Sequence, residues 1–148
     1  MTNKIFDQFD FHDNLIRGIS FNCIDFVSEV HIDLDHILKW PLCKEENTDS
    51  FVLSKANLIF ENVTDLKISI DWGDSNYTSS SSCISINRIE RESVDTSLRF
   101  VNYYRYSIID NSEKNVISFG ASTQILKLIG SPISVNRQYL ANEERGWS

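Results

Sequence analysis

The residues most able to do chemistry in this chain are a histidine and two aspartates at alternate positions, His31, Asp33 and Asp35. On a β-strand, side chains two positions apart lie on one face about 6.6 Å from each other, so an imidazole and carboxylates could share one divalent metal ion. His12 is a further candidate ligand. An outward strand face carries the same residue types for solvation, because charged side chains are mostly exposed. We therefore expect a solvated face and no cofactor, with a metal-dependent enzyme as the alternative.

A second histidine stands beside a carboxylate, at His12 and Asp13, and a pair of this kind can act as an oriented general base. Adjacent side chains of an extended chain point apart, however, and aspartate in such a place commonly stabilises a turn. The chain also lacks a Gly-x-Ser-x-Gly frame at 118–122, a phosphate-binding glycine loop and a dinucleotide fingerprint. These absences lean away from an enzyme, and we assign no catalytic residue.

The elements that must position these residues are strands, because apolar and polar residues alternate with a period of two along most of the chain. The clearest alternation is at residues 66–72, where Leu66, Ile68, Ile70 and Trp72 are expected to face the core. Residues 51–60 and 66–72 are predicted to pair as a hairpin around the polar turn 61–65. The other expected strands are 15–26 with a bulge near Gly18, 29–40, a strand beginning at 84, and 100–109 and 116–121, which are predicted to pair as a hairpin around the polar turn 110–115. Residues 124–129 are a strand or a helical turn.

Many short strands and few helices predict one mainly β domain over 1–148, with a β-rich α+β fold as the variant. Its hairpins would form an antiparallel curved sheet, a sandwich or a partly open barrel. Residues 73–82, rich in serine, are expected to be an exposed loop. The polar tail 136–148 is expected to be a short helix or to be frayed.

The charge balance of 21 acidic against 14 basic side chains, a net charge of −7, disfavours nucleic acid and anionic membranes as partners. It favours a basic protein partner. Asp33, Asp35, Asp71 and Asp74 are the expected docking residues, with Trp72 beside two of them but expected in the core because it shares its parity with apolar neighbours. The oligomeric state is left open.

The chain is expected in the cytoplasm, because its first residues lack the apolar core of a signal peptide and no apolar run approaches a membrane span. Its three cysteines, Cys23, Cys43 and Cys83, are far apart and are expected to be reduced thiols. A further alternative is a small-ligand binder whose curved sheet is lined by Tyr103, Tyr104 and Tyr106.

Four short segments together resemble a loose group of small uncharacterised bacterial proteins. They are Phe11-His12-Asp13, the Asn62-Val63-Thr64-Asp65 turn, Asp71-Trp72 and Ser118-Phe119-Gly120-Ala121. Some members of that group are placed with the immunity proteins of bacterial polymorphic-toxin systems. The resemblance implies a cytoplasmic binder that neutralises a toxin and carries no catalytic residues.

Overall fold

The computed structural model describes residues 4–5, 10–41, 50–74, 76, 82–95 and 102–146. Cys43 and most of the expected serine-rich loop, residues 75 and 77–81, lie outside the described residues. The strands are β1 (Lys4–Ile5), β2 (Leu15–Ile24), β3 (Val27–Lys39), β4 (Phe51–Ser69), β5 (Ile84–Ser93), β6 (Tyr104–Asp110), β7 (Val116–Ala121), β8 (Thr123–Leu128) and β9 (Ile133–Val135), and η1 (Glu143–Arg145) is a 3-10 helix.

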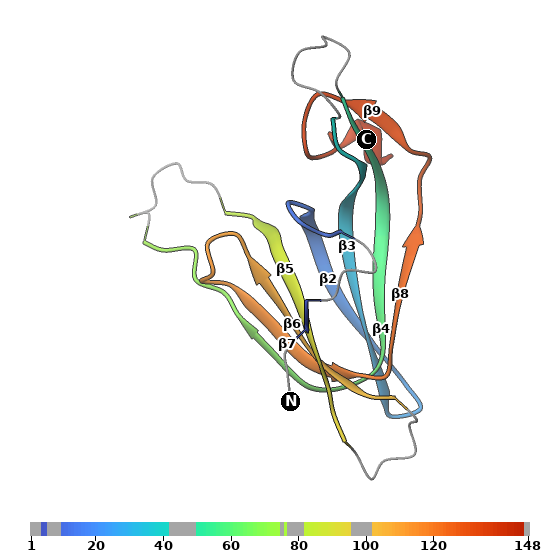
Figure 1. Ribbon diagram of the computed structural model, residues 1–148, viewed down its shortest axis with the longest axis vertical. Helices are drawn as coiled ribbons and strands as arrows, with labels where there is room; N and C mark the ends of the chain where they lie inside the picture. Colours follow the sequence, from blue (N-terminus) through green and yellow to red (C-terminus); the bar gives the residue numbers. More distant parts are fainter. Residues whose placement is uncertain are drawn as a thin grey trace.

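All strand pairs are antiparallel, and six strands close a ring in the order β5-β2-β3-β4-β7-β6, with β6 returning to β5. In Figure 1 the ring is drawn out into two arms that meet where β4 bends. One arm holds β2, β3, β8 and the first part of β4, and the other holds β5, β6, β7 and the end of β4. The prediction of a mainly antiparallel β fold is therefore confirmed, in a ring-like form that is not an even barrel.

The long strand β4 connects the two arms. From Val52 to Val63 it pairs with β3, and beyond this point it pairs with β7. Asn62 and Asp65 adopt positive φ angles of 56° and 55°, which Asn and Asp tolerate better than most residues, and this bends the strand. The predicted hairpin of 51–60 with 66–72 is wrong: turn chemistry at 61–65 bends a strand that stays paired on both sides of the bend.

Other local predictions agree with the structure. The register between β2 and β3 shifts between Ile16 and Gly18, which is the expected bulge. Residues 110–115 join β6 to β7 as a hairpin. The ambiguous segment 124–129 is strand, because β8 pairs with β4 from Ala56 to Glu61.

The core lies between the arms and is filled by the inner faces of β3 to β7. Phe60 packs edge-on against Phe119 and Tyr106, with ring centroids 4.6 and 4.9 Å apart. Each such buried aromatic side chain contributes about 1.5–3 kcal/mol relative to exposure. A second, smaller cluster of Ile37, Leu53 and Leu140 lies beneath β9 and the C-terminal segment. Among the residues that the structure describes, no helix has the length and apolar character needed to cross a membrane.

Candidate binding groove

His31 and Asp33 lie on the outer face of β3, where they line a shallow concavity of about 420 Å³ together with Lys55 and Asn57. His31 Nε2 is 3.0 Å from Glu29 Oε1, and His31 Nδ1 is 3.1 Å from Asn57 Nδ2. Both ring nitrogens are therefore engaged by neighbouring side chains. Within the described ranges, no group of three or more His, Cys, Asp or Glu side chains is placed to hold a metal ion.

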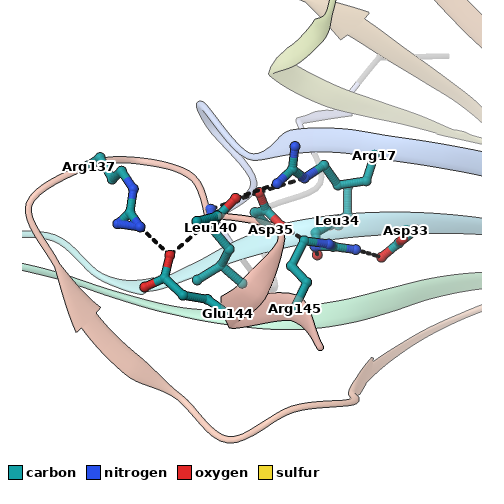
Figure 2. Close-up of polar contacts among 9 residues, drawn as sticks. Arg17, Asp33, Leu34, Asp35, Arg137, Leu140, Glu144 and Arg145 are labelled. Atoms are coloured by element: carbon teal, nitrogen blue, oxygen red, sulfur yellow. Dashed lines mark hydrogen bonds and ion pairs between the residues drawn. The ribbon is translucent and has the colours of Figure 1, made fainter. Parts of the chain in front are cut away.

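Asp35 lies on the same face but is fully buried, so the expectation of a solvated face is wrong at this residue. Arg145 donates to Asp35, Asp33 and the Leu34 carbonyl oxygen, as Figure 2 shows. Arg17 Nε lies 3.0 Å from Asp35 Oδ2, and the Leu140 N–H donates to the same oxygen at 3.0 Å.

The cause of this burial is the C-terminal segment, residues 136–146, which folds across the outer face of β3 and ends in η1. Residues 136–142 are irregular, and the expected short helix is limited to the single 3-10 turn Glu143–Arg145. Of the four expected docking carboxylates, Asp35 presents no surface, and Asp33, which is 32% exposed, is already paired with Arg145.

His12 lies apart from these residues. Its Nδ1 is 3.1 Å from the Asn87 carbonyl oxygen, its Nε2 is 3.5 Å from Asp13 Oδ2, and its ring stacks on Trp40 at 6.2 Å. The structure therefore does not bring His12 to the face of β3 that carries His31.

The three tyrosines belong to the core and its rim. Tyr106 and Tyr103 are buried, and the Tyr103 hydroxyl donates to the Asn62 carbonyl oxygen at 2.8 Å. The Tyr104 ring lies under the Arg91 guanidinium at 4.2 Å. Burial raises the pKa of Tyr106, and the nearby Arg91 opposes this shift. None of the three lines the concavity over His31 or the pocket between Ile16 of β2 and Ile68 of β4.

The groove lies between β2, the end of β4 and residues 82–84, which lead into β5. Ile16 and Ile19 line it on one side, and Ile68, Ile70 and Trp72 line it on the other, around a volume of about 430 Å³. Ile68, Ile70 and Trp72 are 47%, 38% and 53% exposed, so the prediction that they belong to the core is wrong. Their alternation is real, but the face that they share borders the groove and does not belong to the core cluster of the described residues.

A smaller hollow of about 240 Å³ continues along the same two strands. Phe21 and Val30 line it from the β2–β3 hairpin, and Val63, Asp65 and Leu66 line it from the bend of β4. Phe21 faces inward, since it pairs with the buried Val30, yet it is 67% exposed. The apolar surface thus extends from the bend of β4 to Trp72.

Turn chemistry sets the acidic residues at the end of the groove. The Asp71 N–H donates to Asn115 Oδ1 at 2.6 Å, which ties the end of β4 to the β6–β7 hairpin. Asp71 Oδ1 then accepts the N–H of Gly73, whose φ of 76° suits glycine. Asp71 and Asp74 are both exposed beside Trp72.

Asn115 is held in turn by the buried carboxylate of Asp110. Burial alone would raise the pKa of Asp110, but hydrogen bonds from Asn115 and Ser112 outweigh this effect and hold the pKa below its ordinary value. An ionised Asp110 thus helps to position the rim that carries Asp71.

The sequence missed Ile16, Ile19 and Phe21 as groove residues and Arg145 as a structural one. The one signal in the sequence was the length of the apolar alternation, which continues to Trp72. In the structure the pairing of β4 with β3 ends earlier, at Val63. Comparisons of the chain with protein-family models, with curated proteins and with solved structures found no match.

Proposed function

We propose that this chain is a non-enzymatic protein-binding domain, an immunity or adaptor protein of the bacterial cytoplasm, that docks a basic partner on the groove and its acidic rim. The observation that carries the proposal is Trp72, a half-exposed aromatic residue between the exposed carboxylates of Asp71 and Asp74 at the end of an apolar groove. Monomeric proteins rarely leave such a surface uncovered without a use for it.

The chemistry of the surface supports this proposal. Aromatic anchors in partly enclosed apolar sites supply much of the binding energy in protein interfaces, while charges at the rim guide encounter and orientation. A net charge of −7 attracts a basic protein from a distance. The exposed Cys23 thiol suits a reducing compartment such as the cytoplasm.

Affinity capture with the tagged protein from extract of its native organism, at low and high salt, tests the proposal when variants are compared. We expect Trp72→Ala to lose the captured partner, because its aromatic surface is removed. We expect the double variant Asp71→Asn, Asp74→Asn to lose it as well, most clearly at low salt.

The matched control is Glu143→Gln with Asp95→Asn, which removes the same charge from two exposed residues that do not line the groove. It should retain capture. A single stoichiometric partner that binds the Trp72 and Asp71/Asp74 variants as well as the original chain would exclude this docking surface.

A further inference from the structure

We infer that the groove takes an extended segment of the partner, which adds as a strand to the open edge of β4. This inference rests on the proposed function and specifies its partner: a peptide segment with apolar residues at alternate positions and Lys or Arg at its ends.

The open edge lies on the last part of β4. Between Thr64 and Ser69 this strand pairs with β7 on one side. On the other side the pairing with β3 ends at Val63, and within the described residues no strand replaces it. Peptide groups along such an edge present donors and acceptors in the spacing that another extended chain matches.

The side chains next to this edge define what the added strand must carry. Ile68 and Ile70 project to the inner face, opposite Ile16 and Ile19 of β2. Alternate residues of a strand paired with β4 would point into this groove, and the residues between them would point to the outer side. Apolar side chains are therefore favoured at every second position.

Charge decides between a foreign segment and a second copy of this chain. Asp71 and Asp74 lie exposed beyond one end of the open edge, and Asp65 is exposed at the other end. Basic residues that flank an apolar segment would meet carboxylates at both ends. Two copies that each carry a net charge of −7 would repel one another instead.

The test is a selection of displayed random peptides against the full-length chain. We expect enriched sequences with apolar residues at alternate positions and Lys or Arg at both ends. Ile70→Lys should weaken the binding of a selected synthetic peptide by about tenfold or more, because it places a charge where an apolar side chain would be buried. Ile125→Lys is the matched control: Ile125 is 44% exposed on β8, does not line the groove, and its substitution should leave binding unchanged.

The strand geometry has its own readout. A selected peptide that is N-methylated at every second residue should bind in one register and fail in the other, because only one edge of the peptide pairs with β4. Amide hydrogen exchange at residues 64–69 should slow when the peptide binds. Equal binding of both methylated peptides would overturn strand addition.

Three other results would also overturn the inference. They are no enrichment, enrichment of peptides without alternation, and a dimer of this chain that Ile70→Lys dissociates.

Other results would contradict the proposed function and not strand addition. If Ile70→Lys weakens the binding of the selected peptides but the double variant Asp71→Asn, Asp74→Asn does not, the acidic rim plays no part in docking. Strand addition to β4 would still be supported. If a natural partner requires Trp72 for binding but does not slow amide exchange at residues 64–69 of this chain, the proposed docking surface is supported and strand addition is excluded.

Discussion

At the scale of single residues, Arg145 shows how a charged side chain can belong to the interior. Its guanidinium and the Asp35 carboxylate are both fully buried, the Leu140 N–H donates to Asp35, and Arg17 forms a second ion pair with the same carboxylate. Removing one member of such a pair leaves a buried charge with part of its compensation lost, and this commonly costs 3–5 kcal/mol.

We therefore expect Arg145→Met to lower the free energy of unfolding by about 3 kcal/mol, as measured by urea denaturation. Adding Asp35→Asn should restore part of this loss, because the uncompensated charge disappears. Arg137→Met is the control. It removes a more exposed pair with Glu144 and should cost less than about 1 kcal/mol. Equal losses of unfolding free energy in the two arginine variants would contradict a buried, stabilising pair between Arg145 and Asp35.

His36 is a second buried polar residue of β3, on the inner face. Its Nδ1 lies 2.7 Å from Asn14 Oδ1, and its ring centroid lies 5.5 Å from that of Phe11. Burial lowers the pKa of His36 from its ordinary value of 6.5, although the charge of Asp10 acts in the opposite direction. The folded protein thus keeps this imidazole neutral at pH values where the unfolded chain protonates it.

Because the unfolded state binds the extra proton, His36 should make the protein less stable as the pH falls below about 6.5, by at most about 1.4 kcal/mol per pH unit. His36→Gln keeps a side-chain donor for Asn14 but cannot titrate. We expect the unfolding free energy of this variant to fall less between pH 7 and 5.5 than that of the original chain. Parallel pH profiles of the two proteins would refute a neutral His36.

At the scale of elements, the bend of β4 is what opens the groove, and Tyr103 holds this bend. Its hydroxyl contacts the Asn62 carbonyl oxygen at 2.8 Å and Thr64 Oγ1 at 2.7 Å. Gly120 of β7 lies against the same ring. A Cβ atom at Gly120 would be 2.7 Å from Tyr103 Cε1 and 2.9 Å from Thr64 Oγ1, which is too close without movement.

We expect Gly120→Ala to lower the unfolding free energy by about 1–3 kcal/mol, because the tyrosine and the bend must shift to admit the methyl group. Gly130→Ala is the control, since its nearest neighbour, Lys55 Cβ, would be at an ordinary 3.8 Å. Thermal unfolding followed by circular dichroism measures both variants. A Gly120→Ala protein as stable as the control would mean that this contact does not constrain the bend.

At the scale of the whole molecule, the C-terminal segment completes the arm that contains β3. It covers Asp35 with Leu140 and Arg145, and Leu140 joins Ile37 and Leu53 in the second apolar cluster. The segment is far in sequence from β3 and β4, and its contacts with Asp35, Ile37 and Leu53 are additional to those between the strands.

Removal of residues 136–148 should therefore destabilise the protein at least as much as Arg145→Met, by about 3–5 kcal/mol, because it also uncovers Ile37 and Leu53. The urea midpoints of the truncated and full-length chains measure this difference. A truncated chain with an unchanged midpoint would show that the segment only rests on the surface.

Local sequence determines where several strands and turns of this protein lie. Alternation placed β3 and the β2 bulge correctly, and the polar run 110–115 predicted the β6–β7 hairpin, because these features depend on neighbours within a few residues. Alternation also assigned His31, Asp33 and Asp35 to a single face. Of the candidate site, the sequence identified Asp71, Asp74 and Trp72 as neighbours.

What only the tertiary structure decided is which faces are covered. Alternation states that Ile68, Ile70 and Trp72 share a face, but whether that face is core depends on what packs over it, and all three side chains are exposed beside the groove. Asp35 is the converse case: its face looks solvent-bound until Arg145, 110 residues later, folds over it. A period of two in the sequence tells which side chains share a face of a strand, whereas the burial of that face depends on segments that are distant in the sequence.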